Sequence, residues 1–132
     1  MVVRRDGTQL HQVIAPRAGL EHPDWSPDGR WISFNIGPEN QDARNSGSVL
    51  VVHPDGRGPH VLRAATKRLR FYKPVWSPDG RKLLVGCFDT AAEVERLCVV
   101  DAHGGTPAAI VSGRDGGGVN YPAWGTFPAA TP

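Results

Sequence analysis

Few residues of this chain have the type and spacing that chemistry requires. Its five histidines do not pair at the four-residue helical spacing of a zinc-protease site; they are His11, His22, His53, His60 and His103. The chain has no Gly-x-Ser-x-Gly nucleophile motif, no P-loop and no Gly-x-Gly-x-x-Gly loop. We therefore expect no catalytic residue, no metal site and no cofactor, and we expect that the chain is not an enzyme.

Asp28 and Asp79 are the best candidates for a pair of catalytic carboxylates, because they recur with identical neighbours. The same recurrence is what a turn-forming role predicts. In Trp-Ser-Pro-Asp-Gly, Pro presets φ, Asp accepts local backbone hydrogen bonds, and Gly adopts a positive φ. We interpret both carboxylates as parts of hairpin turns.

Cys87 and Cys98 are the only cysteines. A hairpin centred near Ala92–Glu93 would place them opposite each other on neighbouring strands, where they could touch. A directly cross-strand disulfide is strained by the geometry that the bond demands. We expect two small buried hydrophobic residues.

The elements that would position these residues form an internal repeat. Pro23–Arg30 recurs at Pro74–Arg81, and a third, degraded copy begins at Pro122. A second motif, Val51–Gly56, matches segments before and after it, which are Val2–Gly7 and Val99–Gly104. Two motifs that share one period of about 50 residues indicate a repeat architecture. The residues that define the repeat, which we expect to be structural, are Trp25, Ser26, Pro27, Asp28, Gly29, Trp76, Ser77, Pro78, Asp79, Gly80 and Trp124.

Each repeat is typical of four short strands separated by tight turns, which is the pattern of a propeller blade. We expect one all-β domain over residues 1–132, a partial propeller of about two and a half to three blades. Its parts are the outer strands of a split blade (1–14), blade one (23–63), blade two (74–111) and the start of a further blade (122–132). Within them we expect inner strands at Asp24–Trp25, Val75–Trp76 and Ala123–Trp124, with the three tryptophans as packing anchors.

Pro-x-Trp-Ser-Pro-Asp-Gly-Arg, followed by an apolar strand and then Val-Val-Asp-x-x-Gly-Gly, resembles the WD-like propeller repeat of the TolB family. The propeller domains of prolyl-oligopeptidase-like and tricorn-like proteases carry similar repeats. The resemblance to TolB implies a protein partner that binds at the ring's face or channel. The alternative that it implies is a fragment of the propeller domain of a larger peptidase, which gates or positions substrate.

A basic segment marks the candidate binding surface. We expect a long loop at Ala64–Lys73, and residues 63–73 carry five positive charges beside two aromatic rings. The candidate binding residues are Arg63, Lys67, Arg68, Arg70, Phe71, Tyr72 and Lys73. Such a rim could hold an anionic partner, and a solvated loop is the alternative.

The net charge and the length of the apolar runs bear on the class of partner and on the compartment. Fifteen basic and thirteen acidic residues leave a formal charge of +2, too little to predict nucleic-acid or membrane binding. No apolar run approaches the roughly 20 residues of a membrane span, and the first residues are too polar for a signal peptide, so the sequence as written predicts a cytoplasmic protein.

The expected strands stop short of a closed ring. The C-terminal end would have an inner strand, at Ala123–Trp124, without the rest of its blade. The N-terminal end, residues 1–14, would have two outer strands without the inner strands of their blade. We therefore expect a head-to-tail homodimer that closes a six-bladed ring.

Overall fold

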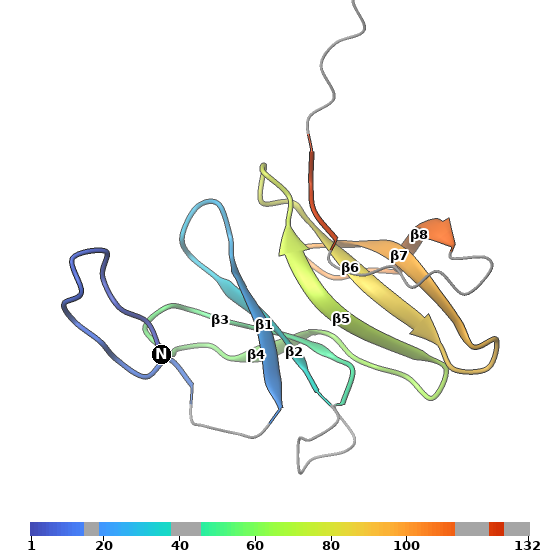
Figure 1. The fold of residues 1–132 in the computed structure, drawn as a ribbon, viewed down its shortest axis with the longest axis horizontal. Helices are drawn as coiled ribbons and strands as arrows, with labels where there is room; N and C mark the ends of the chain where they lie inside the picture. The colour runs from blue at the N-terminus through green and yellow to red at the C-terminus, as the bar shows by residue number, and fades with distance from the viewer. Residues whose placement is uncertain (15–18, 38–45, 113–121, 126–132) are drawn as a thin grey trace, which may run out of the picture.

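The computed structural model describes residues 1–14, 19–37, 46–112 and 122–125. Its strands form two four-stranded antiparallel sheets (Figure 1). The first sheet, blade one, consists of β1 (Leu20–Trp25), β2 (Ile32–Ile36), β3 (Val49–Val52) and β4 (His60–Arg63). The second, blade two, consists of β5 (Leu69–Trp76), β6 (Lys82–Asp89), β7 (Val94–Asp101) and β8 (Ala108–Ser112). None of the described residues forms a helix that could cross a membrane.

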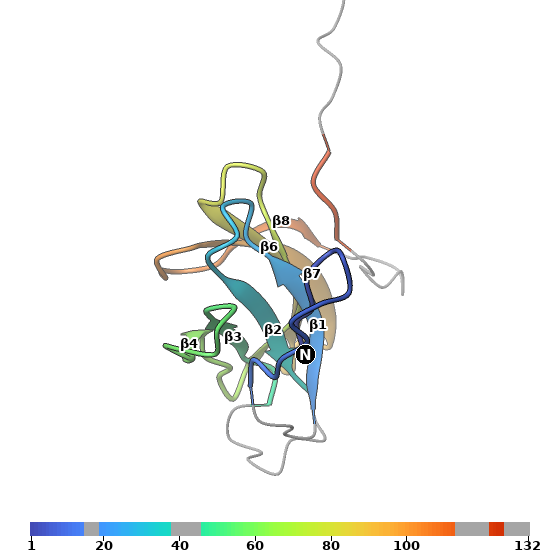
Figure 2. The same ribbon diagram turned by 90° about the vertical axis from the view of Figure 1, so that its left-hand side faces the viewer.

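Each blade is a meander whose strands pair in chain order. The inner strand of blade two, β5, lies against β1 and β2 of blade one, so the two sheets stand side by side (Figures 1 and 2). The all-β class and the propeller-like arrangement agree with the expectation from the sequence.

The inner strands start earlier than the sequence indicates. β5 begins at Leu69 and not at Val75, because a register shift between Tyr72 and Val75 lets the strand accommodate Pro74. β1 has the matching shift between Glu21 and Asp24, around Pro23. At both bulges one residue has a positive φ, 51° at His22 and 50° at Lys73.

The Ser-Pro-Asp-Gly turns have the expected structure in both blades. The Ser26 hydroxyl donates to Asp28 Oδ1 (2.6 Å), which also accepts the N–H of Arg30 (3.0 Å). The Gly29 N–H donates to the Ser26 carbonyl (2.9 Å), and Gly29 has a φ of 70°. Ser77, Asp79, Gly80 and Arg81 repeat these contacts in blade two. The turn-forming interpretation of Asp28 and Asp79 is confirmed.

Residues 1–14 form a hairpin that pairs through one bridge, Val2 with His11, and not through two full strands as expected. The bridge is the counterpart of the pair Val51 and His60 between β3 and β4. The hairpin lies on the side of blade one that faces away from blade two (Figure 1). There Val13 packs with Ile32 and Val52.

The expected strand at Ala123–Trp124 is absent, since the described residues 122–125 pair with no sheet. Trp124 is nonetheless docked: its indole Nε1–H donates to the Val75 carbonyl at 3.0 Å. The rest of the expected further blade, 126–132, lies outside the described residues.

The main core joins the two blades. Phe71, Leu83 and Val85 of blade two are at most 1% exposed and cluster with Val49 and Val51 of β3. Burial of these side chains at the junction supplies the hydrophobic free energy that holds the sheets together.

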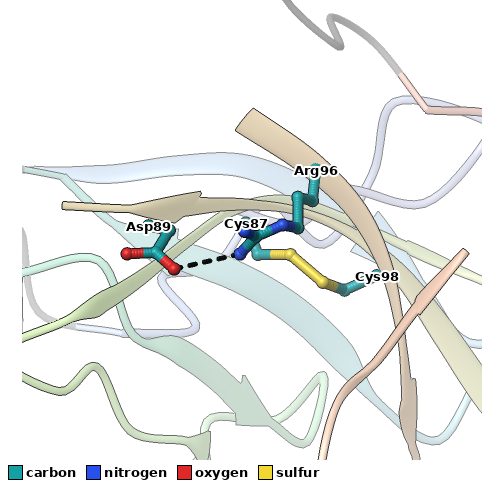
Figure 3. The surroundings of a disulfide bond; sticks show 4 residues. All are labelled: Cys87, Asp89, Arg96 and Cys98. Atoms are coloured by element: carbon teal, nitrogen blue, oxygen red, sulfur yellow. Dashed lines mark hydrogen bonds and ion pairs between the residues drawn. A yellow bond between two sulfur atoms is a disulfide. The ribbon is translucent and has the colours of Figure 1, made fainter. Parts of the chain in front are cut away.

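Cys87 and Cys98 lie in this core and form a disulfide, so the expectation of two free thiols was wrong (Figure 3). The hairpin turn lies one residue closer to β6 than expected, which pairs Cys87 with Arg96 and Cys98 with Val85. The cysteines are therefore diagonal neighbours with Cα atoms 6.1 Å apart, within the range that a disulfide spans.

Candidate binding surface

The basic segment is not the long loop that the sequence predicts. Leu69 to Lys73 belong to β5, and Phe71 lies in the core at 1% exposure, so its ring cannot form part of an exposed rim. The alternating pattern of a strand turns Phe71 inward, while the adjacent Arg70 and Tyr72 are half-buried.

Most of the positive charges in this segment already have partners within the chain. Arg63 Nη1 donates to the Gly105 carbonyl (2.7 Å), and its guanidinium lies over the Phe71 ring, 5.5 Å from the centroid. Arg70 donates to the Ser46 carbonyl. Lys67 is exposed, and the backbone N–H of Lys73 donates to Asn35 Oδ1 (3.2 Å).

Arg68 belongs to an ion-pair cluster with the buried carboxylate of Asp89. Arg68 Nη2 and Arg96 Nη1 each lie 3.1 Å from Asp89 Oδ2, while the backbone N–H groups of Ala91 and Ala92 donate to Asp89 Oδ1 (Figure 3 shows the Arg96 pair). The hydrogen bond from Arg68, together with those from Arg96 and the two amides, holds the pKa of Asp89 well below its usual range. Arg68 therefore stabilises the turn between β6 and β7.

Tyr72 lies across the sheet from Gly86, and its ring fills the space where a side chain at Gly86 would stand. Burial, followed by the nearby charge of Glu95, raises the pKa of Tyr72 to about 12. The phenol therefore stays neutral over the physiological pH range.

The histidines fill turns and packing sites. His53 stacks on the Trp31 ring, with centroids 3.9 Å apart, and His60 meets the same ring edge-on. Within the described ranges, no three His, Cys, Asp or Glu side chains are grouped as metal ligands would be.

A different surface stands out at the open side of blade one. Trp25 and Trp76 occupy equivalent places in the two inner strands, yet Trp25 is 47% exposed and Trp76 only 7%. Trp76 is buried because blade one packs against it. The expectation of a packing anchor is thus confirmed for Trp76 and wrong for Trp25, which has no inner strands of another described blade to pack against.

Trp25 borders an apolar hollow of about 610 Å³ between blade one and the N-terminal hairpin. We call this surface the open face; it is lined by Met1, Val2, Gln12, Val13, Ile14, Leu20, Pro23, Trp25, Ile32 and Phe34. Among the described residues, the lining has no Asp, Glu, Lys or Arg side chain, and such a composition is typical of the centre of a protein–protein interface. The sequence shows that Trp25 and Trp76 occupy the same position of the repeat. It does not show which of the two tryptophans another blade covers.

The junction between blades shows how an equivalent face is covered. The backbone N–H of Trp76 donates to Asp24 Oδ2 (2.7 Å), and Val51 and Leu62 from the outer strands of blade one line the space beside Trp76. On the open face, Val2 and Val13 of the N-terminal hairpin take the places of Val51 and Leu62 beside Trp25. Among the described residues, nothing takes the place of β1 and β2 there.

Of three comparisons with known proteins, the one with solved structures found a similar fold. No family model and no curated protein match the chain. Among solved structures, it is similar to a protein from Agrobacterium tumefaciens that carries the provisional name TolB, with 24% sequence identity and a TM-score of 0.55. The two sheets are propeller-type blades. The match covers 72% of this chain and 35% of the TolB-like chain, so this chain spans a part of that propeller's length. The likeness concerns the fold.

Proposed function

We propose that this chain is a non-catalytic protein-binding module built of TolB-like propeller repeats, and that the open face of blade one binds its partner. The observation that supports the proposal is the contrast between Trp25, at 47% exposure, and Trp76, at 7%, in equivalent strand positions. Trp76 is buried where blade two meets blade one, whereas its counterpart Trp25 in blade one is left uncovered.

The open face has the chemistry of a binding surface for an apolar protein segment. A large aromatic side chain at its rim supplies much contact area at a low cost in conformational entropy. Phe34, Leu20 and Pro23 surround it, so a partner that covers the hollow removes a contiguous apolar surface from water.

The basic segment supports partner binding less well than the open face. Phe71 is buried, and Arg68 and Arg70 are engaged within the chain, so two of its positive charges already have partners. Binding of an anionic partner by this segment, or of a protein in a ring channel, stays a prediction from the sequence.

A photo-crosslinking amino acid at position 25 tests the proposal in the cells that produce the protein. We expect a covalent adduct with a protein, and we expect none from the same group at Ile110, which is also exposed (55%) but lies on β8 away from the hollow. The absence of an adduct at position 25, or equal adducts at both positions, would contradict the proposal.

A second candidate is a segment of the propeller domain of a larger prolyl-oligopeptidase-like enzyme. The observation that favours it is the coverage, since the match accounts for 35% of a longer propeller chain. In that case further blades of the same polypeptide would cover the open face. Sequencing the transcript past the codon for Pro132 tests this candidate: continuation into a Gly-x-Ser-x-Gly hydrolase supports it, and a stop codon excludes it.

A further inference from the structure

We infer that the partner of the open face is a second copy of this chain, arranged head to tail, whose Pro122–Gly125 segment enters the hollow beside Trp25. This inference rests on the proposed function and names the partner of the same surface. It follows from the two ends of the described arc, which present complementary halves of one blade.

The N-terminal half is an outer hairpin. Val2 pairs with His11 as Val51 pairs with His60 in blade one. The turn bonds agree as well: the N–H of Arg4 donates to the Thr8 carbonyl (2.9 Å), as the N–H of His53 donates to that of Arg57 (3.0 Å). Residues 2–13 thus reproduce the β3–β4 hairpin of a blade.

This hairpin is docked where the outer strands of a preceding blade would lie. His11 Nε2 donates to the Pro54 carbonyl (2.9 Å), and Val13 packs on Ile32 and Val52 of blade one. The hollow of about 610 Å³ therefore lies where the two inner strands of that same blade belong. In the complete junction, the corresponding space contains Trp31, directly before β2, in contact with His53 and His60.

The C-terminal half is the start of an inner strand. Trp124 follows Pro122 as Trp76 follows Pro74 and Trp25 follows Pro23. The Trp124 indole N–H donates to the carbonyl of Val75. Val75 occupies in blade two the position that Asp24 occupies in blade one. Across the first junction, the Asp24 carboxylate accepts a hydrogen bond from the backbone N–H of Trp76. Trp124 is therefore attached to blade two at the place where Trp76 meets blade one.

Two chains joined head to tail bring the two halves together. The inner segment at Trp124 of one copy, still attached to its own blade two, would stand between that blade and the open face of the next copy. A second junction of the same kind closes the assembly if each chain turns the ring by about half a revolution. Two blades from each copy and two composite blades then give about six, within the usual range for propellers.

Light scattering on purified variants and their mixture tests the inference. The wild-type chain is expected at twice the 14.2 kDa of one copy. Trp25→Glu and Trp124→Glu are each expected near the single-chain mass, because each places a charge in both junctions. Ile110→Glu is the matched control, since it changes an exposed apolar residue outside the open face, and it should keep the double mass.

Mixing the two monomeric variants distinguishes a head-to-tail contact from a symmetric one. In a mixed pair, one junction joins an intact Trp25 face to an intact Trp124 segment, and both substitutions fall in the other junction. We expect the mixture to recover the double mass in part. A symmetric contact of Trp25 with Trp25 gains nothing from mixing.

The inference is wrong if the wild-type chain has the single-chain mass, if Trp25→Glu keeps the double mass, or if the mixture stays monomeric. Equal melting temperatures of the variants and the wild type, measured at a dilution where the wild type is monomeric, show that the substitutions leave the fold intact. A monomeric wild type that still forms adducts through position 25 with another protein would leave the proposed function standing. The absence of any adduct would remove both.

Discussion

The backbone N–H of Trp76 donates to the carboxylate of Asp24 at 2.7 Å, and this bond joins the inner strands of the two blades. It crosses 52 positions of sequence. Because Trp76 is 7% exposed, its N–H has little access to water and depends on this acceptor. The junction is thus secured by a specific polar contact as well as by apolar packing.

Asp24→Ala should lower the free energy of unfolding by about 1–3 kcal/mol, because it leaves a buried donor without a partner. Asp24→Asn retains an acceptor oxygen at the same place and should recover most of the loss. Urea denaturation followed by tryptophan fluorescence measures both variants. A midpoint of the alanine variant equal to that of the wild type would show that the bond contributes nothing.

Gly80→Val should destabilise the protein by about 1–3 kcal/mol, since it forces a β-branched residue into a positive φ. The φ of Gly80 is 68°, and the nearest atom to an added Cβ is Pro27 Cδ at 3.7 Å, so the cost comes from the backbone and not from a clash. Arg81→Val is the control, because it adds the same side chain beside the turn, at an exposed position whose φ is not positive. Equal denaturation midpoints for the two variants would rule out the proposed turn.

Stability should fall in acid because of Asp89. Its pKa is held well below the ordinary value by Arg68, Arg96 and two backbone amides, so the carboxylate binds its proton more weakly in the folded than in the unfolded chain. The contribution is complete above the unfolded pKa of about 4 and is lost as the pH falls towards the folded pKa.

Asp89→Asn should therefore show a smaller decrease in denaturation midpoint between about pH 7 and pH 3 than the wild type does. Glu93→Gln, at an exposed position in the turn before β7, should keep the wild-type decrease. The account of the cluster fails if all three proteins lose the same stability.

The denatured, unreduced protein should contain no titratable thiol, because Cys87 and Cys98 are joined. Reduction should lower the unfolding free energy by about 2–3 kcal/mol, the value for a short closed loop. A Cys87→Ala, Cys98→Ala double variant should not respond to reductant. Two thiols per chain in the unreduced sample would show that the disulfide is absent.

The sequence predicts the local features of this fold well. Ser-Pro-Asp-Gly contains its own donors, acceptors and positive-φ residue, so the turn at Ser26–Gly29 follows from neighbouring residues alone. Strand β3 coincides with an apolar run, Val49–Val52, that turn residues follow, and such a pattern is typical of a short strand.

Features that depend on distant residues were not predictable in the same way. The length of β5 follows from a bulge that accommodates Pro74, and the burial of Phe71 follows from packing against blade one. The disulfide depends on a shift of the hairpin turn, since moving the turn changes which residues face each other. Arg68 and Asp89 are 21 positions apart in the sequence. The residues around Arg68 therefore do not indicate that its charge is paired with a carboxylate.

The accessibility of the open face in the assembled protein tests the central claim most directly. A cysteine placed at Pro23, which is exposed in the single chain and lines the hollow, can be labelled with a thiol reagent because the natural cysteines are joined. Labelling at Ala108, an exposed position on β8, controls for the reagent. If another protein chain covers this face, the Pro23→Cys thiol will react several-fold more slowly than the Ala108→Cys thiol, and adding Trp25→Glu will remove the difference. Equal rates at the two positions, unchanged by Trp25→Glu, would contradict the claim.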